Sequence, residues 1–76
     1  MFTEEKIQSL DEIAGVYGCE LLLPPAQGIN TPFFDVSDLR FFDQIAFRNF
    51  MIEVDNVVGS YEIVESNGKC FVVIND

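Results

Sequence analysis

The sequence has no histidine and no tryptophan, and only four of its 76 residues are lysine or arginine. Without histidine there is no imidazole base, so Ser-His-Asp and Cys-His catalysis and ordinary zinc sites are excluded. The two cysteines, Cys19 and Cys70, are far apart in the chain and would need other ligands to hold a metal. No glycine-rich phosphate loop with its lysine is present. We therefore expect no enzyme activity, no cofactor and no metal site.

Long apolar runs are also missing. No stretch approaches the ~18 residues that a bilayer-spanning helix needs, and the first six residues lack the cationic and apolar regions of a signal peptide. These absences predict a cytoplasmic protein. In that compartment Cys19 and Cys70 are expected to be free thiols that act as small core residues. A disulfide between them across a sheet stays open as an alternative.

The charge of the chain is strongly one-sided, with 13 acidic residues against four basic ones and a net charge of −9. Such a protein is repelled by nucleic acids and by anionic membranes, so direct binding to either is not expected. Two interpretations of the acidity remain. It keeps the protein soluble, or it attracts a partner protein with a basic surface.

Apolar residues are abundant for so short a chain, at 49% with eight phenylalanines. This composition predicts an ordered single small domain over residues 1–76. A domain of this size has too little interior to bury every apolar side chain. The surplus is expected at the surface, where contiguous apolar side chains mark a binding or oligomer face.

The clearest local pattern is an N-terminal helix. Thr3 is a suitable N-cap, Glu4 and Glu5 suit the first turn, and Gly18 suits the left-handed position that ends a helix. Apolar residues recur at helical spacing and predict one buried stripe. The stripe consists of Ile7, Leu10, Ile13, Ala14 and Tyr17.

The middle of the chain is harder to interpret. Residues 19–23 predict a short strand that ends at Pro24, residues 26–32 a loop, and residues 33–36 an extended or loop-like segment. Ser37 is a second candidate N-cap and predicts a short second helix over residues 38–45. The rival interpretation begins a strand several residues earlier.

From Phe47 onward, apolar and polar residues alternate. Phe50, Ile52 and Val54 predict a strand with one apolar face. A tight turn is expected at residues 55–56. Residues 57–58 would then open the next strand, with Gly59 as a candidate bulge.

The strongest signal lies at Asn67-Gly68, where two β-prone runs flank a dipeptide typical of a type I′ turn. A two-residue turn fixes the register of the strands on either side. The expected cross-strand pairs are Glu65 with Cys70, Val64 with Phe71, Ile63 with Val72, Glu62 with Val73, and Tyr61 with Ile74.

Together these elements predict an α+β fold, with the N-terminal helix packed on an antiparallel sheet of about four strands. One sheet face is almost entirely apolar and is expected to carry the helix. The reverse face mixes apolar and acidic residues, so it either binds a partner or is covered by the short second helix. Its members would be Phe47, Asn49, Met51, Glu53, Val58, Ser60, Glu62, Val64, Phe71, Val73 and Asn75.

In size, acidity and lack of histidine the chain is similar to the small inhibitors that phages and mobile elements direct against host nucleases. That class includes DNA mimics, anti-CRISPR proteins and uracil-DNA glycosylase inhibitors. The resemblance implies a protein partner with a basic surface, for example a nuclease. Homo-oligomeric accessory subunits, such as a homodimer, and antitoxin or immunity proteins are the alternatives. The expected partner-binding residues are Glu4, Glu5, Asp11, Glu12, Glu20, Phe47, Met51, Glu53, Glu62 and Phe71.

Overall fold

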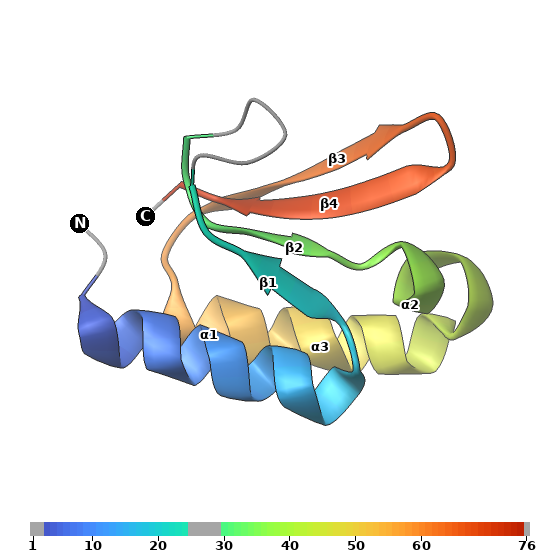
Figure 1. Ribbon diagram of the computed structural model, residues 1–76. Coiled ribbons are helices and arrows are strands. Elements are labelled where there is room, and N and C mark those ends of the chain that lie inside the picture. The colour runs from blue at the N-terminus through green and yellow to red at the C-terminus, as the bar shows by residue number, and fades with distance from the viewer. Residues whose placement is uncertain (1–2, 25–29, 76) are drawn as a thin grey trace.

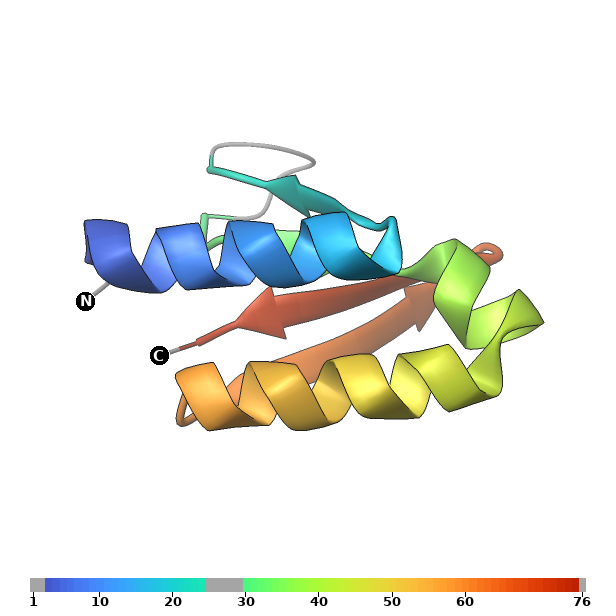
Figure 2. The same ribbon diagram turned by 90° about the horizontal axis from the view of Figure 1, so that it is seen from below.

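The computed structural model describes residues 3–24 and 30–75, which form a four-stranded antiparallel sheet with helices on one side. The strand order is β1-β2-β4-β3. Helices α1 and α3 lie side by side under one face of the sheet, whereas α2 lies near the β3–β4 turn (Figures 1 and 2). The predicted α+β architecture is confirmed.

Helix α1 spans Glu4–Tyr17 and has the predicted boundaries. The Thr3 side chain accepts a hydrogen bond from the Lys6 backbone N–H at 3.1 Å. Gly18 has φ 70° and donates its backbone N–H to the Ala14 carbonyl. Both ends of the helix are therefore fixed by capping residues that are visible in the sequence.

Strand β1 comprises Glu20–Leu22 and pairs antiparallel with β2, Phe33–Asp35. The short strand after α1 is thus confirmed, and the extended segment near Phe33 is also a strand. Strand β2 in turn pairs with the C-terminal strand, so it links the N-terminal strand to the C-terminal hairpin. Part of the predicted loop, residues 26–29, lies outside the described residues.

Two helices follow where one short helix was predicted over residues 38–45. Helix α2 comprises Ser37–Phe42 and helix α3 comprises Gln44–Val57. Asp43 separates them with a non-helical backbone conformation (φ −146°, ψ 80°). Its carboxylate accepts a hydrogen bond from the Ala46 backbone N–H at 3.1 Å and so acts as the N-cap of α3.

The prediction of a strand through residues 50–54 is wrong, because these residues belong to α3. Phe50 and Val54 are fully buried, whereas Ile52 between them is 55% exposed. Phe50 and Val54 lie one helical turn apart and face the core, and Ile52 lies on the opposite side of the helix. The predicted turn at residues 55–56 and the strand start at residues 57–58 are wrong for the same reason, since α3 continues to Val57.

The C-terminal hairpin agrees with the sequence prediction at every pair. Strand β3 is Tyr61–Ser66 and strand β4 is Lys69–Ile74. All five predicted cross-strand pairs are present, together with Ser66–Lys69 next to the turn. Asn67 and Gly68 have φ values of 52° and 76°, as a type I′ turn requires. Strand β3 forms one edge of the sheet.

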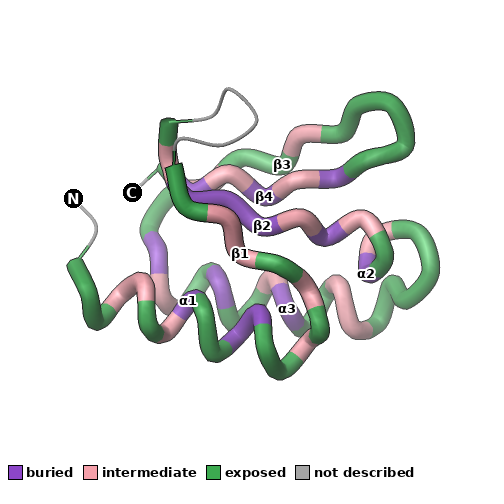
Figure 3. Tube along the Cα trace, in the orientation of Figure 1, coloured by how far each residue is buried: buried purple, intermediate pink, exposed green. Residues whose placement is uncertain are grey.

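The core lies between the sheet and the two long helices, where the buried segments of Figure 3 face one another. Phe50 of α3 is central to it. Its ring makes edge-to-face contacts with Phe34 of β2 at 4.9 Å and with Tyr17 of α1 at 5.7 Å between centroids. Cys19 and Cys70 are free thiols, so the alternative of a disulfide is not realised.

The outer face of the sheet, which points away from α1 and α3, differs from the predicted reverse face. Phe47, Asn49, Met51 and Glu53 belong to α3 and are not on the sheet. The short helix does not cover this face either, because α2 packs into the inner core through Leu39. The remaining outer-face residues include Glu62, Val64, Phe71 and Val73, joined by Phe33 across the sheet.

Candidate protein-binding surfaces

The described surface was compared with the features of metal, membrane and protein-binding sites. Within residues 3–24 and 30–75, no three His, Cys, Asp or Glu side chains come together as a metal site would require. No helix in this part of the chain has the length and apolar character to cross a membrane. Exposed apolar and charged side chains meet in three areas, and these are the candidate functional sites.

The first area, the helical face, is the outward surface of α1 and α3. A shallow hollow of about 320 Å³ lies between the two helices. Glu12 of α1 and Glu53 of α3 line it, together with Val16, which is 75% exposed. One acidic side chain from each helix thus lines a hollow that also contains aliphatic side chains.

The pKa of Tyr17 in α1 is affected by Glu53 in α3. Hydrogen bonding to Glu53 raises the pKa of the Tyr17 hydroxyl, and partial burial and the charge of Glu53 add to the increase. The interaction joins the C-terminal end of α1 to the middle of α3. Glu53 also lines the hollow that Glu12 lines from α1.

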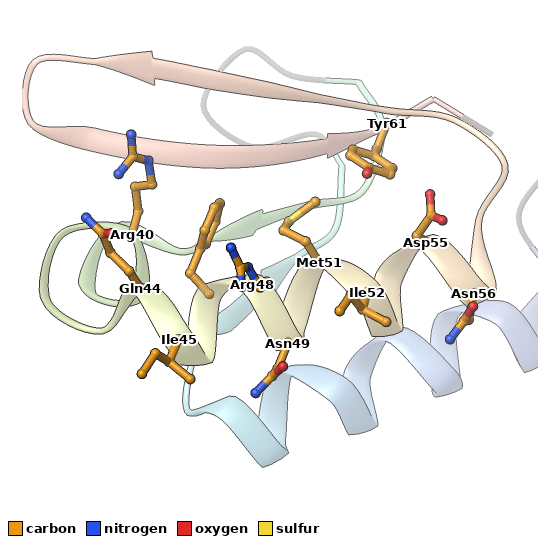
Figure 4. Close-up of a pocket in the computed structure, with 11 residues that line it drawn as sticks. Arg40, Gln44, Ile45, Arg48, Asn49, Met51, Ile52, Asp55, Asn56 and Tyr61 are labelled. Carbon is orange, nitrogen blue, oxygen red and sulfur yellow. The ribbon is translucent and has the colours of Figure 1, made fainter.

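The second area, the α3–β3 groove, is a concave surface of about 780 Å³ beside the free edge of the sheet. Its lining includes Phe47 of α3. Figure 4 shows Arg48, Met51 and Ile52 from α3 and Tyr61 from β3 around it. The sequence gives a reason for this lining. Residues 44, 48, 51 and 55 recur at helical spacing, so they form a stripe along one flank of α3.

Arg40 lies at the end of the groove near the hairpin turn. Its Nε is 2.8 Å from a carboxylate oxygen of Glu65 in β3. The guanidinium carbon also lies 5.9 Å from the ring centroids of both Phe41 and Phe47. These contacts connect α2 to the edge strand and to α3.

The third area is the outer sheet face. A small hollow there is lined by Glu20, Asp35, Lys69 and Phe71, among others. Asp35 has a structural role, since its carboxylate accepts a 2.7 Å hydrogen bond from the Ser37 hydroxyl. The Phe71 ring packs edge-to-face against the fully buried Phe33, with 5.5 Å between centroids.

The predicted partner-binding residues are thus divided among three surfaces and do not form one site. The helical face and its continuation along α1 carry five acids, which are Glu4, Glu5, Asp11, Glu12 and Glu53. The groove carries Phe47 and Met51. The outer sheet face carries Glu20, Glu62 and Phe71.

Sequence reasoning missed the most exposed apolar residues. Phe42 is 86% exposed at the end of α2, and Val16 of α1 is 75% exposed. Ile45 and Ile52 of α3 are 78% and 55% exposed. Phe47 and Phe71, which were expected to be exposed, are half-buried. The available signal was the helical spacing of Phe47, Phe50 and Val54, which leaves the two isoleucines off the buried stripe.

The two thiols are poor nucleophiles in the folded protein. Burial raises the pKa of Cys19 from 9.0 to about 11 and also raises that of Cys70. A thiol with a raised pKa has little thiolate at neutral pH and reacts slowly. Both cysteines therefore fit a packing role.

No family model, curated protein or solved structure matches this chain. Of the three surfaces, the helical face combines the greatest acidity with an exposed apolar centre.

Proposed function

We propose that this chain is a protein-binding inhibitor whose helical face covers a basic surface of a nucleic-acid-handling enzyme. The observation that carries the proposal is the meeting of Glu12 and Glu53 around a hollow that exposes Val16. An acidic rim around an aliphatic centre suits a partner's lysine or arginine. The methylenes of such a side chain pack on the centre while its charge meets the carboxylates.

Charge complementarity gives the proposal its choice of partner. Enzymes that bind nucleic acids present cationic surfaces to the phosphate backbone. A domain of net charge −9 is attracted to the same surface and competes with the nucleic acid for it. Inhibition by occupation needs no catalytic group on the inhibitor. An antitoxin that covers a basic toxin would use the same chemistry.

Further acids lie along α1, outside the hollow. Glu4, Glu5 and Asp11 are exposed on the helix that carries Glu12. Their role is to steer the encounter, because exposed charges act on the association rate more than on the stability of the final contact. Self-association through this face is disfavoured, since both copies would present the same acids.

Matched charge reversals test the proposal. Glu12→Lys with Glu53→Lys reverses the hollow, and Glu20→Lys with Glu62→Lys makes the same change in net charge on the sheet. The ligand is the basic enzyme captured from the source cells and identified by mass spectrometry, and surface plasmon resonance measures its association. A thermal melt of each variant verifies that it is folded.

We expect the helical-face pair to slow association by about tenfold or more and to flatten its salt dependence. The sheet pair should change the rate far less. Equal losses for both pairs would show that only net charge matters and would contradict the assignment of the face. A partner that still binds its nucleic acid when saturated with this protein would contradict inhibition.

A further inference from the structure

Strand β3 leaves one side of its backbone without a partner strand within the described residues, because it is the edge of the sheet. The hairpin fixes which groups face outward. Next to a two-residue turn, Ser66 and Lys69 form a hydrogen-bonded pair, and such pairs alternate along an antiparallel ladder. The hydrogen bond from the Asn75 N–H to the Ser60 carbonyl, at 3.0 Å, has the same phase. The N–H and C=O groups of Tyr61, Ile63 and Glu65 therefore point away from β4.

The side chains of these three residues face the helical layer, because their partners Ile74, Val72 and Cys70 are buried there. Ile63 nevertheless stays 46% exposed. A side chain that points toward the core but remains exposed shows that the inner layer is incomplete at this edge. The outward backbone groups and the uncovered apolar surface thus occur on the same strand.

Helix α3 provides a floor beyond the edge. Seen from the helix side, α3 runs along the β3 side of the sheet, whereas α1 lies toward β1 and β2 (Figure 2). A fifth strand beside β3 would therefore lie over α3. Every second side chain of such a strand would enter the α3–β3 groove and contact Phe47, Met51 or Ile52. Strand β3 has six residues, so the edge offers about 20 Å for pairing.

The charges of the groove select among possible occupants. Arg40 and Arg48 line it and are two of only four cationic residues in the chain. Glu65 pairs with Arg40, whereas Arg48 has no ion-pair partner among residues 3–24 and 30–75. Asp55 lies toward the other end of the groove, beyond Met51. One acidic side chain near Arg48, among apolar ones, is the complementary pattern.

We propose that the α3–β3 groove binds an extended segment of a partner protein, which adds to β3 as a fifth strand. The segment has apolar residues at alternate positions and one acidic residue that pairs with Arg48. Main-chain hydrogen bonds to Tyr61, Ile63 and Glu65 hold it, and the groove selects its side chains. A second copy of this chain fits less well, because its own α3 would occupy the space beneath the joined edge. The groove and the hollow of the helical face have Asn56 in common, but different residues carry the two proposals, so this inference does not depend on the proposed inhibition.

The test uses the intact chain and a random decapeptide display library. Selected peptides are synthesised with a fluorescent label, and their affinities are measured by anisotropy. Two variants disable the groove in different ways. Ile63→Pro removes an outward N–H that no strand pairs, and edge strands tolerate such a proline; Arg48→Glu reverses the exposed charge. Lys6→Glu, on α1, makes the same charge change elsewhere and is the control.

We expect selected peptides to alternate apolar residues and to carry an acid, and Arg48→Glu to weaken them by about tenfold or more. Lys6→Glu should leave their affinity unchanged. Selection against Arg48→Glu itself should enrich a basic residue in place of the acid. Amide hydrogen exchange should slow at Tyr61, Ile63 and Glu65 when peptide binds.

Three results would overturn the proposal. The first is a library that yields no peptide above background. The second is bound peptide that leaves exchange at the three edge amides unchanged. The third is protection of those amides in the free protein together with a dimeric mass in light scattering, because it would show that a second copy occupies the edge.

Discussion

Replacing Phe50 tests the most consequential feature of the fold, which is that residues 44–57 form a helix with one buried stripe. Phe50 has no exposed surface and makes edge-to-face contacts with Phe34 and Tyr17. Phe50→Leu keeps an apolar side chain in place but removes both aromatic contacts, each worth about 0.5–1.5 kcal/mol. The two contacts together amount to roughly 1–3 kcal/mol, and the smaller volume of leucine adds to this loss. Phe50→Ala should cost about 3–5 kcal/mol.

These losses are large for this chain. A 76-residue protein has a free energy of unfolding of about 4–11 kcal/mol, so Phe50→Ala should be close to unfolded while Phe50→Leu remains measurable. Urea unfolding followed by circular dichroism provides the values. Ile52→Ala is the matched control because Ile52 is 55% exposed, and its cost should stay within about 0.5 kcal/mol apart from a small helix-propensity term.

The pair of variants separates a helix from a strand. In a strand, Phe50 and Ile52 would share one face and be buried together. Similar losses for Phe50→Ala and Ile52→Ala would therefore refute the helical assignment and restore the alternating pattern. A large loss at Phe50 with almost none at Ile52 is the expected outcome.

Three further predictions concern the rest of the chain. Gly68→Ala should cost about 1–2 kcal/mol in a thermal melt, because φ is 76° while an added Cβ would meet only open space; an unchanged melting temperature would contradict the turn. Leu10→Ala should cost roughly 2–5 kcal/mol, since Leu10 is fully buried in α1, and wild-type stability in urea would show that this stripe is not packed. Stability should fall as pH rises from 9 toward 11. The pKa of the Cys19 thiol is higher in the folded protein, so on raising the pH this thiol ionises first in the unfolded chain, which favours unfolding. The raised pKa values of Cys70 and Tyr17 act in the same direction. Urea titrations across this range that show constant or rising stability would contradict this.

Local signals account for the parts of the fold that the sequence predicts well. Thr3 and Gly18 fix the ends of α1 by contacts within a few residues. Asn67-Gly68 fixes the register of the whole hairpin, because a two-residue turn leaves one pairing scheme. In each case the determining interaction is short-range, so it can be inferred without knowing the rest of the structure.

Local signals did not decide the secondary structure of α3. Phe50, Ile52 and Val54 alternate like a strand, and Phe47, Phe50 and Val54 recur like a helix. The choice depends on whether Ile52 is buried, and that is decided by the packing of Phe50 against other elements. The Asp43 cap supports the helix, yet Ser37 offered an earlier start.

Because the sequence did not decide between a helix and a strand for residues 44–57, only part of the candidate site could be predicted. The acids of α1 could be placed on one exposed face from the sequence alone, because α1 itself was predictable. Their association with Glu53 could not, since it requires α3 to be a helix beside α1. The groove beside β3 was equally inaccessible, because the strand order that leaves β3 at the edge arises from pairing between β2 and β4.

Site-specific photo-crosslinking tests the central claim, that the helical face is the partner-binding surface, most directly. A photoreactive residue replaces Val16 in one protein and Glu62, on the outer sheet face, in another, and each is irradiated in lysate of the source cells. We predict that the Val16 position yields a crosslink to a basic nucleic-acid-handling protein, which weakens at high salt and disappears when excess nucleic acid is added. Crosslinks from the Glu62 position alone, or from the Val16 position to proteins without a basic surface, would contradict the account.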